Sequence, residues 1–383
     1  MIYNRNILKS ARKYLYSEEA LIFTGARQVG KTVILKTLKS DLEKKGEKTY
    51  FFNLEDPDYL KLLNESPKNL FKIVSIAKDI KTYIFIDEIQ YLENPTNFIK
   101  YIFDEHSSNI KLIVSGSSAF YLDKKFKIFN VRTLSFREFL YFKGQNKYLT
   151  LDFSKLSLIE IDELKMFFEE FVLYGGYPKV VLAEDTVEKV EVLREIAYSY
   201  IKKDIYEAGI KQEDNFYRLF KILSMQVGNL VNSSELASVL GVSKTAVDNY
   251  LYVMEKSFHI SRIKPLFKNI RKELTKMPKA HFLDLGLRNF FANNFNQFEF
   301  RIDKGMFFEN IIYKLLLDKY GGDTIKFWRT QDGKEIDFVL DEQEIAFEAK
   351  AKFRKNKFKI FKENYPEIAI NTITFEDCWK ILG

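Results

Sequence analysis

Short apolar runs alternate with amphipathic stretches along the first part of the chain. Residues 20–24 (ALIFT), 83–86 (YIFI) and 110–114 (IKLIV) have the length of strands, and residues 33–45 after the first run repeat apolar side chains at helical spacing. Strands that are apolar throughout are typical of a parallel sheet with helices on both faces. The pattern predicts an α/β fold, with a doubly wound parallel sheet over residues 1–145.

The loop after the first apolar run has the spacing of a phosphate-binding loop. It matches GxxxxGK[ST] with the residues Gly25, Ala26, Arg27, Gln28, Val29, Gly30, Lys31 and Thr32. Such a loop wraps phosphates with backbone N–H groups, while Lys31 reaches the β- and γ-phosphates as a catalytic residue and Thr32 binds Mg²⁺. The next helix adds the positive end of its dipole. The alternative is a glycine-rich turn without a ligand, but the strand-to-helix setting favours ATP and Mg²⁺.

Acidic and hydroxyl side chains follow the next two apolar runs. Asp87 and Glu88 end one run, and Ser115 and Ser117 follow the other. Since parallel strands end at the same edge of a sheet, Asp87 is expected to hold the metal and Glu88 to polarise the attacking water. Ser115 or Ser117 would sense the γ-phosphate if their strand neighbours the one bearing Asp87; an ordinary turn is the alternative.

Ten segments of the chain carry a family resemblance. In order they are GARQVGKT (25–32), YIFIDEIQ (83–90), IVSGSSAF (113–120), LSFREFL (134–140), YGGYP (174–178), YIKKDI (200–205), HFLDLGLR (281–288), GMFFEN (305–310), FWRT (327–330) and EID (335–337). Together they resemble the P-loop ATPases of the AAA type, from archaea and bacteria, that carry an uncharacterised C-terminal region. The resemblance covers nearly the whole chain and implies ATP binding and hydrolysis.

The chain departs from this family before the LSFREFL segment. Relatives often have a Gly-Arg pair there, whereas residues 123–127 read DKKFK. Arg132 and Arg137 remain candidates for an arginine finger, which would complete a neighbouring subunit's site in a homo-oligomer. A structural role for either arginine is the alternative.

A winged helix is expected over residues 213–275. Helical patterns over residues 216–226, 232–241 and 242–255 predict a helix-turn-helix, in which Ser233 or Ser234 caps the second helix, Gly241 ends it and Ser243 caps the third. The polar residues expected to face a DNA groove are Lys244, Thr245, Asp248 and Asn249.

A basic stretch follows these helices and would contribute a wing. Residues 259–264 and the basic residues beyond them would contact DNA phosphates. Docking of a protein partner is the alternative, and the acidic Asp248 argues against tight binding of DNA.

The C-terminal region is predicted to be a small mixed α/β domain. A helix is expected over residues 304–319, followed by strands over residues 324–328, 335–340 and 344–350. Glu348 and Lys350 share one face of a strand, and Asp337 lies on the preceding strand of a hairpin. Two carboxylates would bind Mg²⁺ or Mn²⁺ and the lysine would activate water or hold a phosphate. This resembles the PD-(D/E)xK nuclease core, with Glu309 as accessory acid; an ordinary half-buried strand is the alternative.

Composition narrows the classes of protein. The chain has 383 residues, 60 Lys+Arg against 53 Asp+Glu, and one cysteine, Cys378, which excludes an internal disulfide or a cysteine-based zinc site. No apolar run reaches the roughly 18 residues that cross a bilayer, and the N-terminus lacks a secretory pattern, so a cytoplasmic protein without membrane contact is expected. The basic clusters at residues 262–279 and 350–359 fit DNA contact or solvated surface.

These observations predict four domains and an ATP-dependent function. The domains are the ATPase domain (1–145), a helical lid (146–212), the winged helix (213–275) and the nuclease-like α/β domain (276–383). The expected function is hydrolysis of Mg-ATP coupled to action on DNA. Two alternatives stay open: a nucleotide-switched adaptor for a protein partner, and an ATP-responsive winged-helix regulator without nuclease activity.

Overall fold

The computed structural model describes residues 5–76, 80–117, 126–148, 151–153, 155–267, 276–322, 324–350 and 358–382. It divides into two compact units, one formed by residues 1–132 with 256–258, and the other by residues 133–255 with 259–383. The first unit thus ends before the predicted boundary at residue 145. No helix in these described ranges is long and apolar enough to span a membrane.

The first unit contains the predicted parallel sheet. Its strands are β1 (Ala20–Thr24), β2 (Lys48–Asn53), β3 (Thr82–Asp87), β4 (Ile110–Gly116) and β5 (Phe126–Asn130), and they lie in the order β2-β3-β4-β1-β5. Every neighbouring pair in this sheet is parallel. The three apolar runs of the sequence are therefore the three central strands, β1, β3 and β4, which are buried along their whole length.

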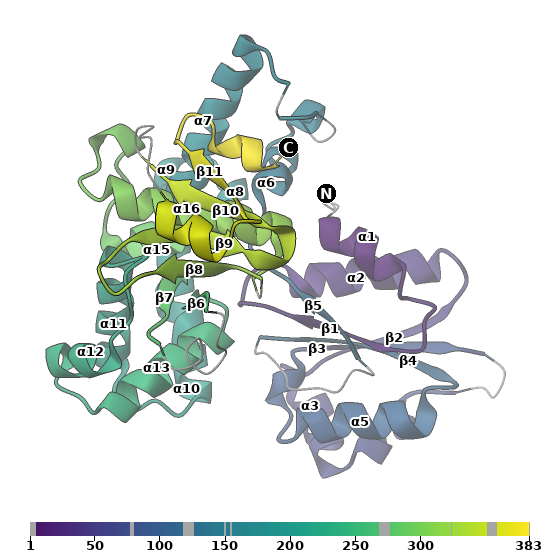
Figure 1. Cartoon of the computed structure of the whole chain (residues 1–383). Helices are drawn as coiled ribbons and strands as arrows, with labels where there is room; N and C mark the ends of the chain where they lie inside the picture. The colour runs from purple at the N-terminus through teal and green to yellow at the C-terminus, as the bar shows by residue number, and fades with distance from the viewer. Residues whose placement is uncertain are drawn as a thin grey trace. The chain divides into compact units, whose positions relative to one another are not determined.

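Helices cover both faces of this sheet, as the doubly wound fold requires (Figure 1). The helices are α1 (Asn6–Arg12), α2 (Lys31–Glu43), α3 (Pro57–Glu65), α4 (Leu70–Ile73) and α5 (Pro95–His106). Leu63 of α3 and Ile99 and Ile102 of α5 pack with Ile84, Ile86 and other strand residues in one core. Figure 1 shows α2 on the opposite face from α3 and α5.

The second unit begins with helices. They are α6 (Phe136–Phe142), α7 (Leu158–Tyr174), α8 (Pro178–Leu182), α9 (Thr186–Glu195), a π-helix (Ile196–Tyr200, η4), α10 (Ile201–Glu207), α11 (Glu213–Met225), α12 (Ser233–Leu240) and α13 (Lys244–Lys256). Asn232, not Ser233 or Ser234 as predicted, caps α12, because its side chain accepts the N–H groups of Ser234 and Glu235. Gly241 ends α12 in the left-handed conformation and the Ser243 hydroxyl accepts the N–H of Ala246, both as predicted.

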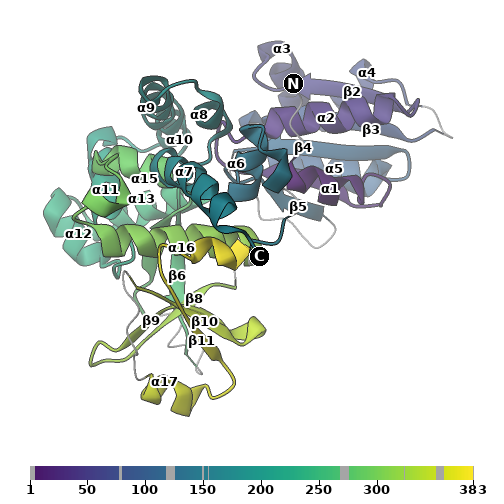
Figure 2. The ribbon, with the colours of Figure 1, turned by 90° about the horizontal axis from the view of Figure 1, so that it is seen from above.

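A six-stranded mixed sheet completes the second unit. Its strands are β6 (Ile260–Pro265), β7 (Lys279–Phe282), β8 (Lys326–Arg329), β9 (Glu335–Leu340), β10 (Ile345–Ala349) and β11 (Ala369–Ile373), in the order β11-β10-β9-β8-β6-β7. The other helices are α15 (Leu285–Ala292), α16 (Lys304–Tyr320) and α17 (Lys359–Asn364). Figure 2 shows α16 and α17 on opposite sides of the sheet. The predicted helix and three strands of the C-terminal region are confirmed as α16, β8, β9 and β10.

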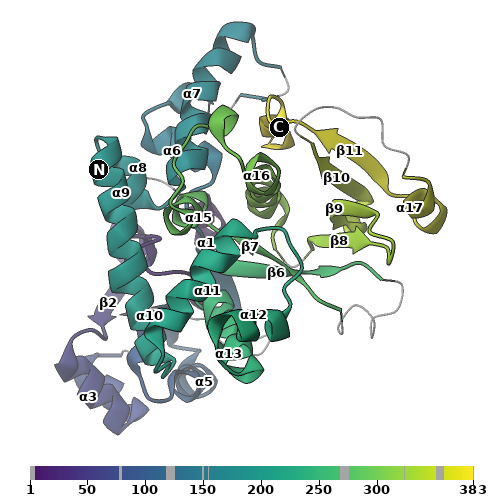
Figure 3. The same cartoon turned by 90° about the vertical axis from the view of Figure 1, so that its left-hand side faces the viewer.

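The predicted boundary at residue 275 falls between two strands of this sheet, β6 and β7. β6 and β7 form the antiparallel pair expected of a wing, next to α11, α12 and α13 (Figure 3). However, β6 also pairs in parallel with β8, so β6 and β7 belong to the same sheet as β9 and β10. Main-chain hydrogen bonding therefore joins the strand that follows α13 to the strands of the C-terminal region.

Two of the family segments, YGGYP and HFLDLGLR, pack closely against each other. The buried Asp284 carboxylate accepts the N–H groups of Gly176 and Leu287. A Cβ at Gly286 would lie 1.9 Å from the carbonyl oxygen of Tyr174, so only glycine fits there. These segments hold α15 against α7 and are explained by packing.

The contact at Gly286 predicts a large loss of stability in Gly286→Ala. Because the backbone of Tyr174 must move to admit the added carbon, the free energy of unfolding should fall by roughly 3 kcal/mol. Gly305→Ala is the matched control, since nothing lies within 4 Å of a Cβ there. Thermal denaturation of both variants checks this, and equal midpoints would show that the close contact is not real.

Candidate active sites

The phosphate-binding loop lies between β1 and α2 in the conformation that its glycines permit. A Cβ at Gly25 would meet the carbonyl oxygen of Val131 at 2.0 Å, and Gly30 has φ 95°. The Lys31 ammonium is buried and donates to the carbonyl oxygens of Gly25 and Ala26, each at 2.9 Å. Thr32, in the first turn of α2, is partly exposed. The loop therefore has its lysine at the helix N-terminus, where phosphates bind.

Arg5 holds this loop by hydrogen bonds, a role that nothing in the sequence pattern indicates. Its guanidinium is buried and donates to the carbonyl oxygens of Val29 and Arg132, each at 2.9 Å. The loop and the end of β5 are thereby tied to the residue that precedes α1. Only the folded chain brings a residue so distant in sequence to the loop.

Asp87 and Ser115 meet because β4 lies between β1 and β3. Ser115 pairs in register with Phe23 of β1, and its hydroxyl donates to one carboxylate oxygen of Asp87 and accepts the N–H of Glu88 at 3.2 Å. The strand that precedes the two serines, β4, is therefore a neighbour of β3, which bears Asp87. The second carboxylate oxygen of Asp87 is buried and has no hydrogen-bond partner among the described residues. A buried, unpaired carboxylate oxygen at this edge fits a ligand for Mg²⁺.

Glu88 follows β3 in an unusual backbone conformation. Its φ of 57° and ψ of 46° place it in the left-handed region, which costs a residue with a side chain about 1–3 kcal/mol and is concentrated at functional sites. Its carboxylate accepts a hydrogen bond from the Gln90 amide and lies 3.8 Å from the Arg27 guanidinium. Gln90 also accepts the N–H of Ser117 at 3.2 Å. Gln90 thus links Glu88 to the residue that follows β4. The sequence pattern did not indicate this role, although Gln90 ends the YIFIDEIQ segment.

The remaining candidates around this site differ in what their side chains contact. The Ser117 hydroxyl is buried and has no partner within the described part of the chain. Arg132 is partly exposed. The Arg137 guanidinium donates to the carbonyl oxygens of Tyr148, Leu151 and Leu382 and lies over the Phe153 ring. Burial lowers the pKa of Arg137. These contacts favour the structural alternative for Arg137.

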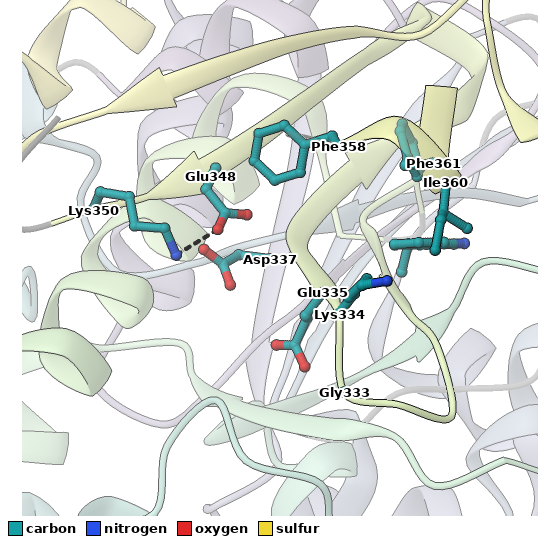
Figure 4. A pocket seen from close by; sticks show the side chains of 10 residues that line it. Gly333, Lys334, Glu335, Asp337, Glu348, Lys350, Phe358, Ile360 and Phe361 are labelled. Carbon is teal, nitrogen blue, oxygen red and sulfur yellow. Dashed lines mark ion pairs between the residues drawn. The ribbon is translucent and has the colours of Figure 1, made fainter. Parts of the chain in front are cut away.

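The second candidate site lies in the C-terminal sheet. Asp337, Glu348 and Lys350 lie together there, as the strand pattern predicts, and Glu309 of α16 lies beside Asp337. Asp337 of β9 and Glu348 of β10 lie across the hairpin, and the N–H of Ala349 donates to Asp337 at 2.8 Å. Lys350 forms an ion pair with Glu348 (Figure 4). These three side chains line a cavity of about 510 Å³. The second carboxylate oxygen of Glu348 is buried without a partner in the described ranges.

Three further residues complete this cluster and were not predicted. Oxygen atoms of Glu309, Glu335 and Asp337 lie within 4.8 Å of one another, a spacing that suits a metal ion. The buried Lys279 of β7 forms ion pairs with Glu309 and Glu335. The buried His281 lies 3.3 Å from Glu309. The basic stretch at residues 262–279 predicts DNA contact or a solvated surface for Lys279, because the pairing of β7 with β6 cannot be read from local pattern.

Burial and mutual repulsion shift the pKa values of these carboxyl groups. Burial, with the neighbouring charges of Glu309 and Glu348, raises the pKa of Asp337 to about 8. Burial also raises the pKa of Glu348, although Lys350 opposes the shift. For Glu309, burial is outweighed by a hydrogen bond with His281 and the charge of Lys279, so its pKa is lowered. A divalent cation would compete with a proton at Asp337, and the donor set of carboxylate oxygens fits Mg²⁺ or Mn²⁺.

The predicted DNA-facing surface of α13 is exposed but partly neutralised. Lys244 and Asp248 form an ion pair at 2.7 Å, one turn apart, while Thr245 and Asn249 are exposed. His259, at the start of the expected wing, is instead buried against Asp204 at 2.9 Å. Part of the basic stretch, including Lys268, Arg271 and Lys272, lies outside the described residues.

Three parts of the chain match family models. Residues 17–140 match a family described as AAA domain, residues 165–297 match a domain of unknown function (DUF8612), and residues 304–375 match another (DUF4143). The chain is 25% identical to an uncharacterised protein of Haemophilus influenzae, covering 98% of this chain and 94% of that protein. It is 23% identical to an uncharacterised protein of Methanocaldococcus jannaschii, covering 93% of this chain and 80% of that protein.

Two solved structures show a partial likeness to this chain. PCH-2 of C. elegans has a TM-score of 0.32 at 16% identity, covering 52% of this chain and 64% of that one. AMPPCP-bound DnaA of Aquifex aeolicus has a TM-score of 0.31 at 14% identity, covering 65% of this chain and 86% of that one. The family match to residues 17–140, together with the loop and sheet, identifies an AAA-type P-loop ATPase domain that binds ATP.

The placement of Glu88 predicts that Glu88→Gln binds ATP but hydrolyses it at least about 100-fold more slowly, because the amide cannot accept a proton from water. Glu93→Gln is the control, an exposed glutamate in the same loop region. Steady-state phosphate release and equilibrium ATP binding measure the two effects. A turnover in Glu88→Gln equal to that of the control would exclude Glu88 as the water-polarising residue.

The raised pKa of Asp337 predicts a pH-dependent gain of stability in Asp337→Asn. Because the pKa of Asp337 is raised from 3.8 to about 8 in the folded state, the free energy of unfolding of the wild type should fall as pH rises from about 4 to about 8 and change no further above that. In chelator-treated protein, the variant lacks this titration and should therefore melt close to the wild type near pH 4 and increasingly above it up to pH 8.5. Added Mn²⁺ should raise the melting temperature of the wild type alone. A variant that melts below the wild type at pH 8.5 would contradict the assignment.

Proposed function

We propose that this chain couples hydrolysis of Mg-ATP to metal-dependent cleavage of DNA. The observation that supports the DNA role best is the convergence of Glu335, Asp337, Glu348 and Lys350 on one cavity, in a chain that also contains an ATPase domain. The carboxylate of Glu309 lies beside those of Glu335 and Asp337. An ordinary half-buried strand would not gather five buried or half-buried ionisable groups, because removing each of them from water costs free energy even where an ion pair offsets part of the cost.

In the ATPase site, each proposed residue has one role. Lys31 neutralises the β- and γ-phosphates, Thr32 and Asp87 hold Mg²⁺, and Glu88 orients and polarises the attacking water. The bound metal neutralises charge that develops on the phosphate oxygens. Ser117 is the better candidate for sensing the γ-phosphate, since the Ser115 hydroxyl is engaged by Asp87 whereas that of Ser117 is unpaired among the described residues.

Oligomerisation would complete this site. Because Arg137 is bound to three carbonyl oxygens of its own unit, Arg132 is our candidate for the arginine finger. A homo-oligomer would present Arg132 to the γ-phosphate of a neighbouring subunit, where it stabilises the charge of the transition state.

In the second site, the carboxylates of Glu309, Asp337 and Glu348 would hold Mg²⁺ or Mn²⁺. The metal supplies an activated water and neutralises charge on the phosphate. Lys350 would orient that water or hold the scissile phosphate. The water oxygen bonds to phosphorus, one P–O bond to a sugar breaks, and the sugar oxygen takes up a proton. The exposed Thr245 and Asn249 of α13, with the β6–β7 wing, would bring duplex DNA to this unit.

A protein partner is the second candidate, and α7 carries the observation that favours it. Leu158, Ile159 and Met166 of this helix are 81%, 75% and 68% exposed. Large apolar side chains gathered on one helix are typical of a protein-docking surface. Under this alternative the ATP state would control docking, and binding of DNA would be absent or indifferent to salt.

The cleavage activity is tested with labelled duplex, branched and single-stranded DNA in Mg²⁺ or Mn²⁺. We expect Asp337→Ala to lose at least about 100-fold in cleavage rate while its ATP turnover persists, because the two sites use separate residues. Asp332→Ala, an exposed acid in the loop before β9, should cleave like the wild type. Cleavage that persists undiminished in Asp337→Ala would refute the nuclease assignment.

A further inference from the structure

A cavity of about 430 Å³ lies among α9, the π-helix, α11 and the end of α15, and none of its lining residues belongs to either candidate active site. Its volume is in the range of roughly 300–1,000 Å³ typical of small-molecule sites. One part of its lining is aromatic and another is cationic. We call it the aromatic pocket and define it by Tyr198, Tyr217, Phe290, Arg194, Arg218 and Lys221.

The aromatic part is built on a π-helix. The chain between α9 and α10 winds as a π-helix over Ile196–Tyr200, a rare turn that is frequent at functional sites. The Tyr217 hydroxyl of α11 donates to the carbonyl oxygen of Ala197 at 3.2 Å, which ties this wide turn to α11. Burial raises the pKa of Tyr217, so its hydroxyl stays a neutral donor.

Tyr198 is presented at the surface by this turn. Its ring contacts Tyr217 at 5.4 Å and Phe290 at 5.8 Å between centroids, yet the residue remains 52% exposed. Phe290 is itself partly exposed. The rings of Tyr198 and Phe290 thus lie partly open to solvent at the edge of the core, where a planar group could pack against them.

The cationic part has little compensating charge. Arg218 and Lys221 lie one turn apart on α11, so they share a face. Arg218 contacts the Asn215 amide, and within the described ranges Lys221 has no ion-pair partner. Arg194 pairs with Glu191 on the surface, where such a pair contributes little. No carboxylate is among the described residues that line the pocket, so it presents net positive charge beside aromatic rings.

We propose that the aromatic pocket binds a nucleotide unit, with its base against Tyr198 and Phe290 and its phosphate held by Arg218 and Lys221. Stacking on aromatic rings tolerates any base, and cationic side chains that hold the backbone phosphate complete a binding mode typical of single-stranded nucleic acid. A free nucleotide offers the same base and phosphate. The pocket uses none of the residues assigned to ATP hydrolysis or DNA cleavage, so this inference does not depend on the proposed function.

The test is fluorescence anisotropy of the full chain with a labelled ten-residue oligothymidylate. Tyr198→Ala should weaken binding roughly tenfold, and Tyr198→Phe should retain it because the ring is kept. Lys221→Ala should weaken binding and reduce the salt dependence by about 0.7 in the slope of log K against log salt, as loss of one phosphate contact requires. The controls are Tyr206→Ala, an 85% exposed tyrosine outside the pocket, and Lys211→Ala.

Competition identifies the source of the nucleotide. Displacement of the probe by thymidine monophosphate at concentrations similar to those of unlabelled oligomer would support a free nucleotide. Displacement by the unlabelled oligomer alone would support single-stranded nucleic acid as the ligand. Inorganic phosphate should not displace the labelled probe, because it lacks a base. Absence of binding by the wild type, or equal binding by Tyr198→Ala and Tyr206→Ala, would overturn the proposal.

Discussion

The ATPase site depends on the parallel insertion of β4 between β1 and β3. Because the three strands run in the same direction, the phosphate-binding loop, Asp87 and Ser115 all emerge at one edge of the sheet. The pairing of Ser115 beside Phe23 brings its hydroxyl to the Asp87 carboxylate. A shift of one residue in this register would turn Ser115 to the opposite face of the sheet and leave Asp87 without its partner. The side chains supply the chemistry, and the order of the strands brings them together.

Five ionisable side chains lie close together in the second unit. Glu309, Asp337 and Glu348 come from a helix and two strands, and the unit places Lys279 and Lys350 beside them. These lysines offset part of the negative charge, but burial and, to a smaller extent, neighbouring carboxylates still raise the pKa values of Asp337 and Glu348, which favours a divalent cation there. Since β6 follows α13 and pairs with both β7 and β8, it belongs to the same sheet as the strands that carry Asp337 and Glu348.

Local pattern in the sequence could predict much of the ATPase site and part of the second one. The loop, β3 and β4 are continuous segments whose apolar character and terminal residues are visible in the chain, and Asp337, Glu348 and Lys350 follow from strand alternation alone. Arg5, Lys279 and His281 could not be found this way, because long-range packing and the pairing of β7 bring them to their sites. The role of Asn232 as the cap of α12 could not be assigned from the sequence, because it is one of three adjacent residues whose side chains can all cap a helix.

The central claim is that one chain joins ATP hydrolysis to action on DNA, and ATP turnover measured against DNA concentration tests it most directly. Duplex, branched and single-stranded DNA would each be titrated into the wild type at low and at moderate salt. Our account predicts that at least one form of DNA raises turnover to a plateau, and that added salt weakens the response steeply because phosphate contacts release counterions. Turnover that is the same with every DNA at both salt concentrations would contradict the account and favour a nucleotide-switched contact with a protein.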